Sequence, residues 1–96
     1  MHHILFYDVV EDYATRRAHF REQHLAHARK SAENGDLFLA GALADPLDGA
    51  VLVFNGDSPG AAEEFAQSDP YVLNGLVSRW RVRKWNTVIG PGSSPP

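Results

Sequence analysis

Cysteine is absent from this sequence of 96 residues. Its absence excludes disulfide bonds, thiolate catalysis and metal sites built on cysteine. No apolar stretch approaches the roughly 20 residues that a membrane-spanning helix needs, so we expect no membrane partner. The segment that begins at Met1 has neither the basic region nor the cleavage site of a signal peptide. We therefore expect a cytoplasmic location.

The excess of one sign of charge over the other is also small. The formal net charge is −3, whereas a general nucleic-acid binder carries a basic excess, so we expect no nucleic-acid partner. Four of the nine basic residues nevertheless crowd one segment, which contains Arg79, Arg81, Arg83 and Lys84. The local charge of that segment therefore differs from the charge of the whole chain.

The length is that of a single domain. A hydrophobic fraction of 44% is ordinary for a globular protein and is enough for one core. So short a chain buries only about 60–65% of the surface it exposes when unfolded, which favours further burial by self-association. We assign residues 1–89 to the domain and residues 90–96, which are rich in Gly, Pro and Ser, to a flexible tail.

The pattern of strand formers, helix formers and turn residues predicts six main elements. Strands are expected at residues 2–10, 37–43, 50–55 and 76–89, and helices at residues 12–34 and 58–67, with a short turn at residues 69–75. The order βαββαβ is typical of a ferredoxin-like α+β fold. Such a fold has a four-stranded antiparallel sheet with two helices on one face.

The first predicted helix has an inner face of small apolar residues at helical spacing, namely Ala14, Ala18, Leu25, Ala28 and Ala32. His24 lies at the flank of that face, where it can reach both the core edge and solvent.

The other face of the sheet has no helix to cover it. Apolar residues expected there are Phe6 or Tyr7, Leu39, Val53, Trp80 and Trp85. Together they would form a large exposed apolar patch. We therefore expect a second copy of the chain to cover it, in a homodimer or a higher homo-oligomer.

His24 and Asp69 are the candidate proton-handling pair. A histidine titrates near neutral pH, and a carboxylate that orients an imidazole raises its basicity. Each residue also has a plainer interpretation. His24 could be a solvated helix histidine, and Asp69, which precedes Pro70, has the pattern of a helix N-cap.

The sequence motifs around His24 and Asp69 resemble those of a known family. The run Arg21-Glu22-Gln23-His24-Leu25, then Gly41-Ala42-Leu43, then Ser68-Asp69-Pro70-Tyr71-Val72 resembles the YciI-like (YCII-related) family over residues 4–89. The resemblance implies a dimeric α+β barrel, an active-site role for His24 with Asp69 as its partner, and no metal or cofactor.

Basic and aromatic residues are candidates for substrate binding. Arg17 and Arg21 match basic positions before the family histidine and could hold an anionic substrate, or belong to a solvated face. Tyr71 could border the pocket or pack in the core. Arg81, in the middle of the alternating row Arg79, Arg81 and Arg83, could line a cleft, form an exposed edge or pair across a dimer. This row departs from the more apolar strand of the family.

A metal site is not expected, although His24 and His27 have a workable spacing for two ligands, because no third ligand follows. No serine or cysteine nucleophile stands in a recognisable motif. The sequence therefore favours a cofactor-free lyase, isomerase or hydrolase-like enzyme that acts on a small anionic metabolite. The alternative is a non-catalytic small-molecule-binding or dimerisation module.

Overall fold

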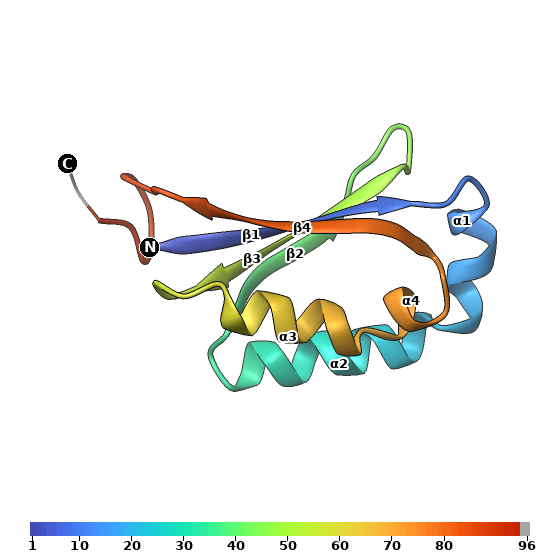
Figure 1. Cartoon of the computed structure of the whole chain (residues 1–96), viewed down its shortest axis with the longest axis horizontal. Helices are drawn as coiled ribbons and strands as arrows, with labels where there is room; N and C mark the ends of the chain where they lie inside the picture. The colour runs from blue at the N-terminus through green and yellow to red at the C-terminus, as the bar shows by residue number, and fades with distance from the viewer. Residues whose placement is uncertain (95–96) are drawn as a thin grey trace.

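Four antiparallel strands form one sheet in the order β2-β3-β1-β4. The computed structural model describes residues 1–94. The strands are β1 (His2–Val9), β2 (Leu37–Ala42), β3 (Gly49–Asn55) and β4 (Val77–Trp85). All helices lie on one face of the sheet (Figure 1). The ferredoxin-like α+β fold expected from the element order is confirmed.

The first helical region is broken, so the prediction of one helix over residues 12–34 is wrong. It consists of α1 (Tyr13–Arg16), the 3₁₀ turn η1 (Arg17–His19) and α2 (Arg21–Glu33). The break falls at Phe20, whose φ of −121° and ψ of 0° leave the helical region. No Gly or Pro marks this place. On both sides of the break a side chain meets the core, because Tyr13 is buried and Phe20 packs against the buried cluster.

The predicted inner face of this helix is correct only in its middle. Leu25 and Ala28 are half-buried, whereas Ala14, Ala18 and Ala32 are exposed. A cavity lies between the middle of α2 and strands β2 and β3. The helix therefore covers the sheet without full contact, and this space is where the candidate site lies.

The second helical region divides at Asp69. Helix α3 (Gly60–Ser68) begins after Ser58, whose hydroxyl accepts a hydrogen bond from the Gly60 N–H at 3.1 Å. The short helix α4 (Pro70–Leu73) follows at once. Between them, Asp69 is extended and its carboxylate accepts the Tyr71 N–H. The N-cap expected from Asp69 and Pro70 is thus present.

Strand register decides which side chains meet the helices. Leu5 pairs with Leu52 and Val82, and all three face the helices, while Phe6 pairs with Val51 and Arg81 on the open face.

Trp80 pairs with Tyr7 and packs against the core. The prediction that it lies on the open face is therefore wrong. Leu39 and Trp85 do lie exposed there, with 65% and 47% of their surfaces accessible.

The segment after β4 folds back over the start of β1. The Ser94 N–H donates to the Thr87 carbonyl at 2.9 Å, and the amino group of Met1 bonds to the Gly92 carbonyl. Thr87 also bonds to the buried His2 ring. Of the predicted tail, residues 90–94 therefore lie against β1, and residues 95–96 are outside the described part of the chain.

Candidate functional site

His24 and Asp69 meet although they are 45 residues apart. Nδ1 of His24, on the first turn of α2, lies 2.9 Å from Oδ1 and 3.1 Å from Oδ2 of Asp69, at the junction of α3 and α4. The carboxylate is completely buried, and 16% of the His24 side chain is exposed. Because an ionised carboxylate only accepts, Nδ1 carries the proton of this bond.

Two further donors hold Asp69 in place. The Tyr7 hydroxyl donates to Oδ2 at 2.7 Å, and the Tyr71 backbone N–H donates to Oδ1 at 3.0 Å. Burial raises the pKa of Tyr7 far above its ordinary value, and the Asp69 carboxylate raises it further. Tyr7 therefore stays a neutral donor at every physiological pH, and the carboxylate has a fixed orientation.

The imidazole of His24 is also held by contacts to the face of its ring. The Tyr71 ring stacks on it at a centroid distance of 3.9 Å and an interplanar angle of 7°, and Phe65 meets it edge-on. With Nδ1 committed to Asp69, the hydrogen bonds of residues 1–94 leave Nε2 unengaged at the cavity. A neutral imidazole in this tautomer has its lone pair on Nε2, where it can accept a proton.

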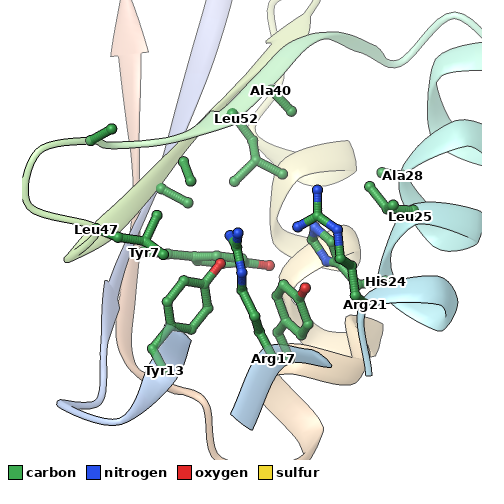
Figure 2. Close-up of a pocket in the computed structure, with 15 residues that line it drawn as sticks. Tyr7, Tyr13, Arg17, Arg21, His24, Leu25, Ala28, Ala40, Leu47 and Leu52 are labelled. Carbon is green, nitrogen blue, oxygen red and sulfur yellow. The ribbon is translucent and has the colours of Figure 1, made fainter. Parts of the chain in front are cut away.

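The cavity beside His24 has a volume of about 340 Å³. That volume is within the range of small-molecule sites. Its sheet wall consists of small and aliphatic residues from β2, β3 and the loop between them, including Ala40, Leu47 and Leu52. Figure 2 shows Arg17 and Arg21 reaching toward that wall from η1 and α2. The site thus combines a cationic side with an apolar one.

Tyrosines complete the lining. Tyr13 lies under Arg17, whose guanidinium carbon is 5.6 Å from its ring centroid. Tyr71 is buried, and its hydroxyl has no acceptor within residues 1–94. Burial raises the pKa of Tyr71, while the guanidinium charges of Arg21 and Arg17 oppose that rise.

The structure gathers most of the residues singled out from the sequence. Arg17, Arg21, His24 and Tyr71 line the cavity, with Asp69 directly behind the imidazole. It does not bring Arg81 there. Arg81 is on the opposite face of the sheet, with its guanidinium 4.5 Å from the centroid of the Phe6 ring. Arg79 and Arg83 share that face with it.

Tyr7 and Tyr13 were not singled out from the sequence as site residues. Tyr7 was left open because β1 carries apolar residues on both faces, so alternation alone could not say which face meets the helices. The pairing of Tyr7 with Ala50 and Trp80 decides it. Tyr13 had no signal, because the predicted straight helix gave it no special position.

His27 points away from this cavity. Its Nε2 lies 3.1 Å from the Phe65 carbonyl, in a separate groove between α2 and α3. Across residues 1–94, no three His, Asp or Glu side chains are grouped as metal ligands would be. The described helices include none that is both long and apolar enough to cross a membrane.

Comparisons with known proteins agree with this fold. A family model described as YCII-related domain matches residues 1–86. No curated protein matches the chain.

Solved structures that resemble the chain include 5-chloro-2-hydroxyhydroquinone dehydrochlorinase from Burkholderia phenoliruptrix in complex with 2,5-dihydroxybenzoquinone. It has a TM-score of 0.75 at 17% identity, covering 88% of this chain and 93% of that one. A NIPSNAP family protein from Agrobacterium tumefaciens has a TM-score of 0.55 at 15% identity, covering 94% and 95%. At these identities the likeness shows the fold.

Proposed function

The chain belongs to the YCII-related domain family, and from that premise we propose that it is a cofactor-free acid–base enzyme in which His24 moves a proton. Asp69 holds the imidazole in the tautomer that leaves Nε2 as the base. The observation that carries this proposal is the 2.9 Å contact between Nδ1 and a fully buried carboxylate. A surface histidine with a capping aspartate would not require that contact.

The chemistry that fits is proton transfer at carbon, in a lyase, isomerase or hydrolase-like reaction. His24 is presented to the cavity as a positioned base, which contributes about 10²–10⁴-fold to such reactions. Covalent catalysis by a thiolate is excluded because the sequence has no cysteine. Asp69 neutralises the imidazolium that forms, as the third member of a catalytic triad does.

The substrate is proposed to be a small anionic molecule. Arg17 and Arg21 place two cations at the cavity, and Tyr71 borders it. The apolar wall formed by β2 and β3 suits a ring or a short carbon skeleton. The structural neighbour named for its action on 5-chloro-2-hydroxyhydroquinone supports a small ring compound by analogy of fold.

The test is a screen of small cyclic carboxylates, lactones and hydroxylated ring compounds for turnover, followed by His24→Gln. The variant should lose about 10²–10⁴-fold in kcat/KM.

His27→Gln is the matched control, since it removes an imidazole one turn later on α2 that does not line the cavity. Full activity in His24→Gln would refute the proposal. Ligand binding that turns nothing over and is unchanged in His24→Gln would favour a non-catalytic binding module.

We also propose that the chain is a homodimer or a higher homo-oligomer that covers the open face of the sheet. Leu39, Trp85 and Phe38 are exposed by 65%, 47% and 45%, and the helices all lie on the other side. Sedimentation should give at least twice the monomer mass.

Leu39→Asp should reduce that mass to the monomer's. Leu73→Asp, at an equally exposed leucine of α4, should not. A stable wild-type monomer would contradict the proposal.

A further inference from the structure

The hydroxyl of Tyr71 is a buried hydrogen-bond donor without an acceptor. The residue is 2% exposed, and no acceptor for its hydroxyl proton is present among residues 1–94. Leaving a buried polar group unpaired costs about 1–3 kcal/mol, so such groups usually have a reason. Tyr7 gives the contrast, because its hydroxyl, equally buried, donates to Asp69 at 2.7 Å.

The charged neighbours of Tyr71 cannot supply the missing acceptor. Arg21 lies close enough to the phenol oxygen to donate to it, and the charges of Arg21 and Arg17 both act on the phenol. A guanidinium has donors only. A ligand can supply the acceptor that Tyr71 lacks, and the two cations favour a ligand oxygen that carries negative charge.

The position of Tyr71 relative to the base gives this donor a role. Its ring lies flat on the His24 imidazole, and both side chains line the same cavity. We propose that the Tyr71 hydroxyl, with Arg21, binds the oxygen on which negative charge develops when His24 removes a proton from carbon. This assignment rests on the proposed function and narrows the substrate to a compound with an acidic C–H next to a carbonyl, or the corresponding hydroxylated ring.

The step balances within the site. The C–H bond breaks, its proton goes to Nε2 of His24, and its electron pair moves through the carbon framework to the carbonyl oxygen. The enolate oxygen then accepts the hydrogen bond from Tyr71. Return of the proton to another carbon completes an isomerisation. Expulsion of a leaving group as an anion completes an elimination, and His24 gives its proton to solvent.

Burial makes this donor effective. The Tyr71 hydroxyl is shielded from solvent, so a ligand oxygen reaches it only when a covering side chain moves aside. A charged oxygen placed there is then stabilised by a fixed dipole in a region of low dielectric. Arg21 is exposed and is the side chain free to turn onto the charge of the ligand as it enters.

The first experiment measures binding of 4-nitrophenol as an enolate mimic, with the phenolate detected by its absorbance. The wild-type protein should bind the phenolate in preference to the neutral phenol. Tyr71→Phe keeps the ring that stacks on His24 and should lose about 10- to 100-fold in phenolate affinity. Equal phenolate affinity in Tyr71→Phe, or no phenolate binding by the wild type, would overturn the inference.

The second experiment compares the melting temperatures of Tyr71→Phe and Tyr7→Phe. Removing the Tyr71 hydroxyl should leave the melting temperature unchanged or raise it, because the hydroxyl has no acceptor within residues 1–94 and Arg21, its neighbour, is exposed to water. Removing the Tyr7 hydroxyl should lower it, because the bond to Asp69 is lost. A fall in Tyr71→Phe as large as that in Tyr7→Phe would show that the Tyr71 hydroxyl has a structural partner, against the inference.

The two proposals can fail separately. If His24→Gln keeps full turnover, the acid–base function fails whatever the phenolate result. If His24→Gln loses turnover while Tyr71→Phe binds phenolate as the wild type does, the base stands and the role of Tyr71 falls.

Discussion

Replacing Asp69 by alanine should destabilise the fold by about 3–5 kcal/mol, far more than the loss of an ordinary helix cap, which costs about 1 kcal/mol. Three donors converge on this buried carboxylate, from Tyr7, His24 and the Tyr71 backbone. Each donor left unpaired costs about 1–3 kcal/mol. The lower end applies to His24, since it borders the cavity and water can reach it.

Replacing Asp69 by asparagine separates its role as a helix N-cap from the effect of its negative charge. The bond from the Tyr71 N–H and the shorter of the two contacts from His24 Nδ1 end on Oδ1, which an asparagine oxygen can occupy. The amide nitrogen then replaces Oδ2 and faces the Tyr7 hydroxyl, which can turn its proton away and accept. Asparagine also caps helices nearly as well as aspartate. Asp69→Asn should therefore cost only about 1 kcal/mol in stability, while losing the charge that supports His24.

The assay is urea unfolding followed by the fluorescence of Trp80 and Trp85, with the free energies of unfolding compared at neutral pH. The Ala variant should lose several times as much stability as the Asn variant. If both lose only about 1 kcal/mol, Asp69 is a simple cap and the reasoning from the three converging donors is refuted.

Other expectations follow from particular groups. Burial raises the pKa of both Tyr7 and Tyr71 above the ordinary value of about 10, so the unfolded chain releases these protons at a lower pH than the folded chain does. The free energy of unfolding, measured by urea titration at stepped pH, should therefore hold below about pH 10 and fall above it, less steeply in Tyr7→Phe. Burial, aided by the adjacent amino terminus, lowers the pKa of His2, so stability should be full above about pH 6.5 and fall in more acidic buffer. His2→Asn should reduce that fall, and an identical acid profile would contradict the assignment. Arg21→Gln should weaken binding of an anionic ligand and flatten its salt dependence, whereas Arg81→Gln, on the far face, should leave both unchanged in calorimetric titration.

Much of the fold can be predicted from local sequence, because whether a segment forms a strand or a helix depends largely on residues close to one another in the chain. The strand-forming residues of β1, the turn residues between β2 and β3, and the Asp69–Pro70 pair each predict their own segment, and the structure has each of them. The contact between His24 and Asp69 was a hypothesis from two motifs, and the folded chain places them together. Their catalytic role remains a prediction for the His24→Gln assay.

The sequence by itself therefore determined which regions are extended and which are helical, their order, and where the polar motifs stand, but not the breaks within the helical regions. Only the tertiary structure decided the break at Phe20, the face of Arg81 and the bond from Tyr7 to Asp69. The reason is the sequence separation over which each kind of interaction acts. Periodicity reports which residues share a face, but a one-residue change of register exchanges the two faces of a strand. That choice is made by contacts between segments far apart in the chain.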